Sequence, residues 1–251
     1  MSDYNNQSPW GAIPAPADMA VDQGLRRFML GVYVKMALGL LLSGALAYLT
    51  SSVPQVRDNL FVIDGVGRLR GYTGVGAIVA FAPLIILIGS NFMMRRATAR
   101  SSGILYWVIV ALVGASLGSV GLLYTGTSIA SMFLVTAIAF GGLSLTGYMT
   151  KRNLSGMLSF AIMGAWGLAA ALLLNAFLLH SGLMLMLLSV VGVVIFAGLI
   201  AAQTQNLKLT YYQVVGDKDS MGALTNFGAL NLYLAFINLF RFLLILFGGR
   251  R

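Results

Sequence analysis

The run LMLMLLSVVGVVIFAGLIAAQ, from Leu183 to Gln203, decides the fold class of this chain. It contains no charged residue and is as long as the helix of roughly 20 residues that crosses a hydrocarbon layer about 30 Å thick. Similar apolar runs precede and follow it, and together they predict seven spans, at residues 28–49, 72–93, 104–123, 129–149, 157–179, 183–203 and 226–247. The runs are continuous and do not alternate, which favours helices over a β-barrel. The sequence therefore predicts an all-α integral membrane protein, a seven-transmembrane-helix bundle.

The composition excludes an ordinary soluble domain. Only 9% of the 251 residues are charged and 59% are hydrophobic, whereas soluble domains carry about 25% charged residues. The chain has no cysteine, which excludes disulfides and thiolate metal sites. Although the net charge is +9, the basic residues form short clusters between the apolar runs, so they indicate membrane topology and not nucleic-acid binding.

The distribution of these basic residues predicts the orientation. We expect a cytoplasmic and disordered N-terminal tail at residues 1–27, followed by a single transmembrane domain at residues 28–251. Counted over alternate connections, the basic residues on the N-terminal side are Arg26, Arg27, Arg95, Arg96, Arg100, Lys151, Arg152, Lys208 and Lys218. The opposite side carries only Arg57, Arg68, Arg70, Arg250 and Arg251. The positive-inside rule then puts the N-terminus in the cytoplasm and the C-terminus outside.

Ionisable side chains are nearly absent from the predicted spans. All seven aspartates lie outside them, the chain has no glutamate, and the single histidine, His180, falls in a short connection. Lys35 and Arg241 are within spans but near span ends, where a long side chain can snorkel to the surface. If either side chain points inward, it must use helix carbonyls, Asn, Gln or water, because no span offers a carboxylate. We therefore expect no catalytic residue, no metal site, no cofactor and no enzymatic activity.

The seventh predicted span carries a polar stripe. Asn231, Asn238 and Arg241 follow at steps of seven and three and so share one helix face, with Ala235 between the two asparagines. Such a stripe is unfavourable against lipid. It therefore predicts a face that turns toward the bundle core, where it forms interhelical hydrogen bonds, or toward a narrow polar pathway.

Other residues in the spans concern packing and helix ends. Thr204 and Gln205, at the end of the sixth predicted span, can cap that helix or line the inner mouth of a pathway. Pro83 lies in the middle of the second predicted span and is expected to kink it. Gly114 and Gly118, four residues apart in the third, predict a close helix contact.

Three stretches resemble signature regions of the Bax inhibitor-1 family, which covers the bacterial YccA-type proteins and the eukaryotic transmembrane Bax inhibitor motif proteins. They are GYMTKRNLS at residues 147–155, GLIAAQTQNLK at 198–208 and GALNLYLAFINLF at 228–240. The resemblance extends from Arg26 to the C-terminus. It implies a seven-helix bundle in which the seventh helix is central and surrounded by the others, and a multi-pass protein of the bacterial inner (plasma) membrane.

The chain departs from the family pattern at positions linked to function. In the family the sixth helix usually ends in Asp-Thr-Gln-x-x-Lys and the seventh reads Leu-Asp-Phe-Ile-Asn-Leu-Phe, and these two aspartates are linked to pH-sensitive calcium leak. Here the aspartate positions are Gln203 and Ala235, and an acidic position after the fourth helix is Asn153. Two carboxylates can share a proton and bind a hard divalent cation, whereas Gln and Ala cannot titrate. The resemblance thus implies an altered gate.

Two functional classes follow from the resemblance. The first is an ion (calcium) leak channel or passive solute pathway lined by the seventh helix. The second is a membrane interaction protein that modulates other membrane machinery, as the YccA-type resemblance implies for the membrane-bound AAA protease FtsH. The expected partners are the lipid bilayer, with calcium or another small ion in the first class and a membrane protease in the second, and no nucleic acid. Reconstituted flux and co-purification of native partners separate the two classes.

Overall fold

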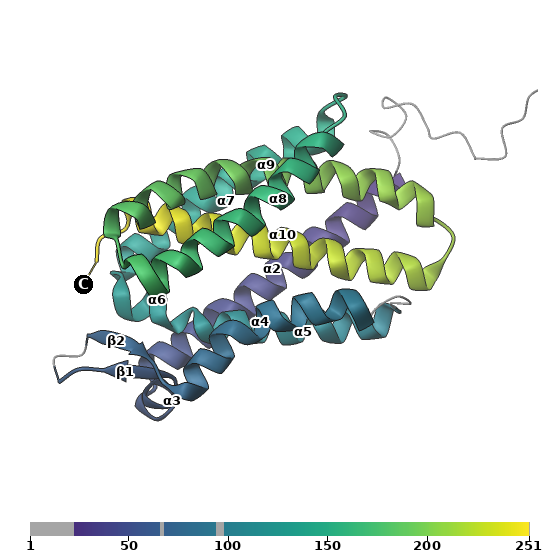
Figure 1. Cartoon of the computed structure of the whole chain (residues 1–251). Helices are drawn as coiled ribbons and strands as arrows, with labels where there is room; N and C mark the ends of the chain where they lie inside the picture. The colour runs from purple at the N-terminus through teal and green to yellow at the C-terminus, as the bar shows by residue number, and fades with distance from the viewer. Residues whose placement is uncertain (1–22, 66–67, 94–97, 251) are drawn as a thin grey trace, which may run out of the picture.

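The computed structural model describes residues 23–65, 68–93 and 98–250, which fold as a bundle of helices with one small hairpin at an end (Figure 1). In chain order the elements are α2 (Gln23–Ser52), α3 (Pro54–Leu60), β1 (Phe61–Ile63), β2 (Leu69–Tyr72), α4 (Gly74–Met93), α5 (Ala99–Ser116), α6 (Gly118–Leu123), α7 (Gly126–Met149), α8 (Ser155–Leu174), the π-helical turn η1 (Asn175–Leu179), α9 (Gly182–Val214) and α10 (Lys218–Phe247). Apart from the hairpin, the predicted all-α class is confirmed for the described residues.

Among the described residues, six helical segments are long and apolar enough to cross a membrane, judged by length and composition: α2, α5 with α6, α7, α8 with η1, α9 and α10. The predicted second span contains α4, whose apolar part, Gly74–Gly89, is shorter than the other six. The start of the predicted span differs because Tyr72 belongs to strand β2 (Leu69–Tyr72), which pairs antiparallel with β1. The helix begins only after Thr73, whose hydroxyl oxygen accepts from Gly76 N at 3.0 Å.

Several helices extend beyond their predicted spans. α9 continues past Gln203 to Val214, and α10 begins at Lys218 rather than at residue 226. The connection between them is tight: Gly216 has a φ of +104°, which glycine adopts without strain, and the Asp217 carboxylate caps α10 by accepting from the Asp219 amide at 3.1 Å.

The predicted N-terminal tail also overlaps a helix, because α2 begins at Gln23 and not at residue 28. The remainder of that tail lies outside the described residues, as do Arg95 and Arg96. Hydropathy marks where apolar side chains stop, whereas the backbone hydrogen bonds of a helix continue into polar sequence. These helices are therefore longer than the predicted spans.

The most buried of the long helices is α10. In its most apolar stretch 61% of the residues are buried, compared with 11% in α8 with η1. It contacts α2, α5, α7 and α9. The Phe236 ring of α10 lies 5.7 Å from the ring of Phe140 and 5.4 Å from that of Phe133, both in α7. Much of the buried core is therefore contributed by α10 and its aromatic contacts.

Two ends of the bundle serve as landmarks. At the α9–α10 end, α2 begins, α7 passes into α8 and α9 passes into α10 (Figure 1). At the C-terminal end, α6 passes into α7 and α10 stops. There Thr125 N donates to the Gly249 carbonyl at 3.1 Å, and Gly249 N donates to Ser128 Oγ at 3.0 Å. These bonds join the end of α10 to the start of α7.

Glycines allow α2 to pack closely against α5 and α6. A Cβ atom at Gly114 would lie 2.6 Å from the Cα atom of Ser43, and one at Gly118 would overlap the Thr50 hydroxyl. Any larger residue would therefore push α2 away. The helix contact predicted from the spacing of Gly114 and Gly118 is confirmed.

Gly147 of α7 allows a similarly close contact with α9, and this contact can be tested by substitution. A Cβ at Gly147 would overlap the carbonyl oxygen of Ala201, which is backbone and cannot move aside easily, whereas a Cβ at Gly142 of the same helix meets nothing within 4 Å. We expect Gly147→Ala to lower the free energy of unfolding by about 1–3 kcal/mol, the usual range for overpacking, measured as a lower melting temperature in detergent. Gly142→Ala is the matched control and should melt at the same or a slightly higher temperature, because Ala is the better helix former. Equal melting of both variants would contradict the α7–α9 contact.

Candidate functional site

Lys35 of α2 contacts two other helices at the α9–α10 end. Its Nζ donates a hydrogen bond to Asn226 Oδ1 of α10, and it lies 5.2 Å and 6.0 Å from the ring centroids of Tyr106 and Trp107 in α5. Tyr106 also donates its hydroxyl proton to the Lys35 carbonyl at 2.7 Å. Lys35 therefore points into the bundle, which differs from the expected snorkelling. Its ammonium group interacts with an amide oxygen and with two aromatic ring faces, because it has no carboxylate partner among the described residues.

Asn226 joins three helices through one amide group. While its Oδ1 accepts from Lys35, its Nδ2 donates to the Ala99 carbonyl and to Ser102 Oγ, both at 2.8 Å. Asn226 is only 5% exposed. The orientation of the amide is fixed by this pattern, because the oxygen must face the lysine and the NH₂ group must face the carbonyl. Lys35, Ser102 and Asn226 form the first polar network.

A second polar network holds the connection between α7 and α8 against α9. Gln205 Oε1 accepts from Leu154 N at 2.7 Å, and Gln205 Nε2 donates to the Arg152 carbonyl at 2.7 Å. Lys208 Nζ donates to the Tyr148 carbonyl at 3.0 Å and lies 5.2 Å from the centroid of the Tyr148 ring. Gln205 and Lys208 are 7% and 6% exposed. Gln205 thus lies in the buried part of the bundle and satisfies backbone groups of the connection.

Thr204 belongs to a third network, which crosses the bundle from α9 to α2. Its hydroxyl donates to the Ile200 carbonyl at 2.8 Å and is 3.1 Å from Ser144 Oγ of α7. Ser144 Oγ is in turn 2.6 Å from the hydroxyl of Tyr33 in α2. Thr204 is fully buried. Three helices at the α9–α10 end are therefore linked by neutral hydroxyl groups.

The polar stripe of α10 is placed differently from the expectation of a core position. Asn231 and Arg241 are exposed, and Asn238 is half-buried. Asn238 Nδ2 donates to the Leu234 carbonyl of its own helix at 2.8 Å. The reason is the arrangement of neighbours: α2, α5, α7 and α9 contact the other sides of α10, and the stripe occupies the side that remains uncovered. A polar pathway along these residues stays a prediction.

The positions that the resemblance assigns to aspartates hold neutral side chains in different surroundings. Ala235 is 1% exposed and belongs to the apolar core of α10. Gln203 is half-buried, and its buried Oε1 atom has no hydrogen-bond partner among the described residues. Asn153, in the α7–α8 connection, accepts from Ser155 N at 2.9 Å. Within the described ranges, no group of three or more His, Cys, Asp or Glu side chains is arranged to hold a metal ion.

Pro83 is buried within α4, and the helix continues on both sides of it. Because a proline in a helix removes one backbone hydrogen bond, the position is a weak point in the helical ladder. The kink expected there stays a prediction.

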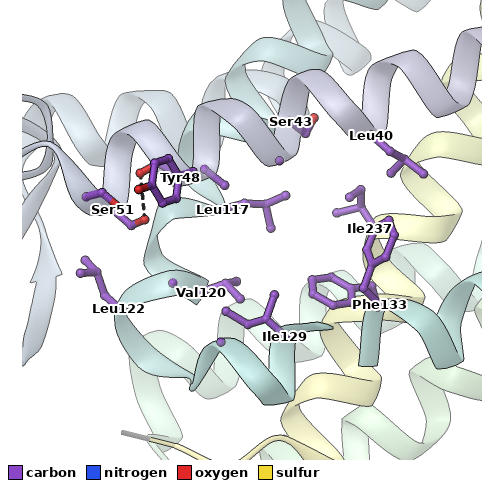
Figure 2. A pocket seen from close by; sticks show the side chains of 16 residues that line it. Leu40, Ser43, Tyr48, Ser51, Leu117, Val120, Leu122, Ile129, Phe133 and Ile237 are labelled. Carbon is purple, nitrogen blue, oxygen red and sulfur yellow. Dashed lines mark hydrogen bonds between the residues drawn. The ribbon is translucent and has the colours of Figure 1, made fainter. Parts of the chain in front are cut away.

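Two cavities lie along the seam between α2 and α7. The cavity near the C-terminal end has a volume of about 420 Å³. Figure 2 shows side chains of α2, such as Leu40 and Tyr48, facing Ile129 and Phe133 of α7 across it, with Ile237 of α10 at one side. The cavity near the α9–α10 end has a volume of about 690 Å³ and is lined by Arg26, Met29, Leu30, Tyr33, Met36, Ala37, Phe140, Gly141, Ser144, Leu145 and Tyr148. The lining of each cavity includes no carboxylate.

Sequence reasoning missed two of the buried polar contacts. One is the bond between Lys35 and Asn226, and the other is the 2.6 Å contact between Ser43 Oγ and the Tyr233 hydroxyl, which links α2 to α10. Asn226 stood at the predicted border of a span and gave no signal of burial. The partners are far apart in the chain, so only their packing in three dimensions brings them together.

Comparison with known proteins agrees with the motif resemblance. A family model described as an inhibitor of apoptosis-promoting Bax1 matches residues 25–251. A protein of Caulobacter vibrioides is 58% identical over 100% of both chains, and a protein of Rickettsia prowazekii is 43% identical over 92% of each. The inner membrane protein YbhL of Escherichia coli strain K12 is 38% identical over 91% of this chain and 94% of YbhL. The resemblance to the Bax inhibitor-1 family is confirmed.

A double-mutant cycle tests the first polar network. Asn226→Leu leaves Lys35 without its acceptor, so we expect it to lower the free energy of unfolding by about 1–3 kcal/mol, the penalty for an unsatisfied buried polar group. Lys35→Met removes the charge, and the double variant should lose less than the sum of the two single variants, by about 0.5–3 kcal/mol. The exposed Asn206 provides the control: Asn206→Leu should change stability by less than about 0.5 kcal/mol. Strictly additive losses in thermal melts would show that the two side chains do not interact.

Proposed function

Because the chain belongs to the Bax inhibitor-1 family, we propose that it is a passive leak pathway for small ions or solutes in a bacterial inner membrane. The family model covers nearly the whole chain, and YbhL, which shares the family, is an inner membrane protein. The observation that carries the proposal is the concentration of buried polar contacts at the α9–α10 end. Three polar networks lie there beside the most buried helix, and they join α2, α5, α7, α9 and α10.

The proposed pathway runs beside α10. Asn231, Asn238 and Arg241 provide a polar lining on the side of α10 that its neighbours leave uncovered. The networks of Lys35 and Lys208 then act as the gate at the α9–α10 end. Hydrogen bonds between neutral groups contribute about 0.5–1.5 kcal/mol each and those of a charged group, such as the lysine ammonium, about 1.5–3 kcal/mol, so a few of them can hold a gate closed and still release it.

We also propose the finer topology. α4 adds a seventh span to the six long apolar helices, so the protein forms one transmembrane domain of seven helices. α10 is the central helix. An odd number of spans puts the two termini on opposite sides. The distribution of basic residues then favours a cytoplasmic N-terminus and a C-terminus outside, although Arg95 and Arg96 of that count lie outside the described residues. No catalytic step is part of this proposal.

The chemistry of the gate favours a leak that does not depend on pH. Gln203 and Ala235 stand where the family resemblance implies aspartates, and neither can titrate. Hydrogen bonds from Ser220 and from the Asp219 amide hold the pKa of the exposed Asp217 carboxyl, in the α9–α10 connection, below its usual value. A lowered pKa means that Asp217 keeps its charge throughout the range from pH 5 to 8 and changes only in stronger acid. It is therefore no sensor in that range.

We expect calcium flux through the unmodified protein to be weak and nearly flat between pH 5 and 8. Two lysines at the gate repel a divalent cation, and no carboxylate of the predicted spans attracts it. Calcium entry into proteoliposomes, followed at several pH values, measures this. Restoring both carboxylates with Gln203→Asp and Ala235→Asp should create a pH response, because two close carboxylates raise one pKa toward the working range. Each single change should do less.

The matched control is the pair Gln203→Asn and Ala235→Asn, which has nearly the same size as the dicarboxylate pair but no titratable group. It should stay flat. A steep pH response of the unmodified protein would contradict the proposal, since its gating would then reside in other groups. Elution of each variant as a single species in detergent checks that Ala235, which is buried, tolerates the larger side chain.

One observation favours the second functional class, a membrane interaction protein that modulates the membrane-bound AAA protease FtsH. In the single chain Asn231 and Arg241 of the stripe are exposed and Asn238 is half-buried, and polar side chains are unfavourable against lipid. A partner helix could cover it. Such a role would need no flux at all.

A photo-crosslinking residue at Asn231 separates the two classes in intact membranes, with the same residue at Met163 of α8, which is 73% exposed, as the control. For a leak pathway we expect no protein crosslink specific to Asn231. A crosslink to FtsH from Asn231 but not from Met163, together with absent flux, would favour the interaction protein instead.

A further inference from the structure

The cavity near the α9–α10 end, here named the Arg26 cavity, has the shape of a lateral groove. One stripe of α2, from Arg26 to Ala37, forms one wall, and one stripe of α7, from Phe140 to Tyr148, forms the other. The rims face outward, since Leu30 of α2 is 53% exposed and Leu145 of α7 is 58% exposed. The groove is therefore accessible from the side of the bundle, where the bilayer lies.

The length of the groove matches one leaflet of a membrane. At 1.5 Å per residue, the stripe from Arg26 to Ala37 is about 16 Å long. Half of a hydrocarbon layer about 30 Å thick is about 15 Å. The floor ends at the aromatic contacts of Phe140, Phe236 and Phe133, which separate this cavity from the one in Figure 2. A lipid acyl chain that enters the groove at Arg26 would thus end near the middle of the bilayer, as acyl chains do in a leaflet.

The chemistry of the lining changes along the groove. Arg26 lies at the first turn of α2 and is exposed. Beyond it, the walls are formed by methionine, leucine, alanine, glycine and phenylalanine residues, by Tyr148, and by Tyr33 and Ser144, whose hydroxyl groups are hydrogen-bonded to each other. Methionine adapts its shape to flexible apolar ligands. A cation above an apolar slot of this length fits a lipid with a negatively charged headgroup.

We propose that the Arg26 cavity binds one anionic membrane phospholipid, with its phosphate on the Arg26 guanidinium and an acyl chain between α2 and α7. Arginine binds phosphate through two parallel hydrogen bonds, and the absence of carboxylates from the lining leaves the phosphate without a repelling group. The site is independent of the proposed leak, because it requires only that the bundle be embedded in lipid.

Purified protein in detergent, titrated with dioleoyl phosphatidylglycerol and observed by native mass spectrometry, tests the proposal. We expect one tightly held phosphatidylglycerol per chain. Dioleoyl phosphatidylcholine has the same acyl chains and also a phosphate, but its choline ammonium cancels the negative charge and is repelled by Arg26, so it should bind at least about tenfold more weakly. Inorganic phosphate alone should not bind, because it lacks the chain that fills the groove.

Neighbouring residues supply matched controls. Arg26→Gln should weaken phosphatidylglycerol binding about tenfold, whereas Arg27→Gln, at the adjacent exposed position outside the cavity lining, should bind as the parent protein does. Gly141→Leu fills the groove, while Gly142→Leu, the next residue of α7 and outside the lining, does not; a Cβ at either glycine meets nothing within 4 Å. We expect loss of the bound lipid only for Gly141→Leu. If that variant misfolds, Ala37→Leu blocks the same groove from α2.

Three results would overturn the proposal. Equal retention of the two lipids would show that charge plays no part. Unchanged binding by Arg26→Gln and by the groove-filling variant would place the lipid elsewhere. A dimer without bound lipid, lost in Gly141→Leu, would show that a second copy of the chain occupies the groove.

Discussion

Polar groups inside this bundle must find partners without help from any carboxylate, and this constraint determines many contacts between the helices. Lys35 uses the amide oxygen of Asn226, and Lys208 uses the Tyr148 carbonyl, each beside an aromatic ring. Removing a cation from water carries a penalty of several kcal/mol unless partners replace the lost hydration. The positions of these acceptors therefore limit where α2 and α9 can lie against α10 and α7.

Hydropathy was sufficient to predict the fold class, because a helix that meets lipid or core on all sides must be apolar along its whole length. It was a poor guide to the polar connections. α9 continues to Val214, and strand Phe61–Ile63 pairs antiparallel with strand Leu69–Tyr72. In those segments the structure depends on backbone hydrogen bonds and on single capping residues, such as Thr73 at the start of α4. A hydropathy average over many side chains does not detect such residues.

In the candidate site, too, the sequence pattern predicts part of the arrangement, and the packing of the helices determines the rest. Periodicity groups Asn231, Asn238 and Arg241 on one face of α10, but it cannot tell which way that face turns. The direction depends on the four helices that cover the other sides. Likewise, nothing in a single sequence connects Lys35 to Asn226, because 191 positions separate them. The family resemblance identified the positions of Gln203 and Ala235, but only the structure reveals the unpartnered Gln203 oxygen.

Hydrogen-bond networks without titratable groups also limit which stimuli can open the proposed gate. The bonds of Gln205 to Leu154 and Arg152 involve no group that gains or loses a proton between pH 5 and 8, so a change of pH has nothing to act on there. Opening must instead come from a shift of the helices themselves. Tyr33 gives a physical route for such a shift: it lines the Arg26 cavity, and through Ser144 it reaches Thr204, which directly precedes Gln205 in α9. A lipid in that cavity would press on the first member of this chain of contacts. For the proposed leak pathway, occupancy of the α2–α7 seam, whose two cavities are lined by no carboxylate, is therefore a more plausible input to the gate than protonation.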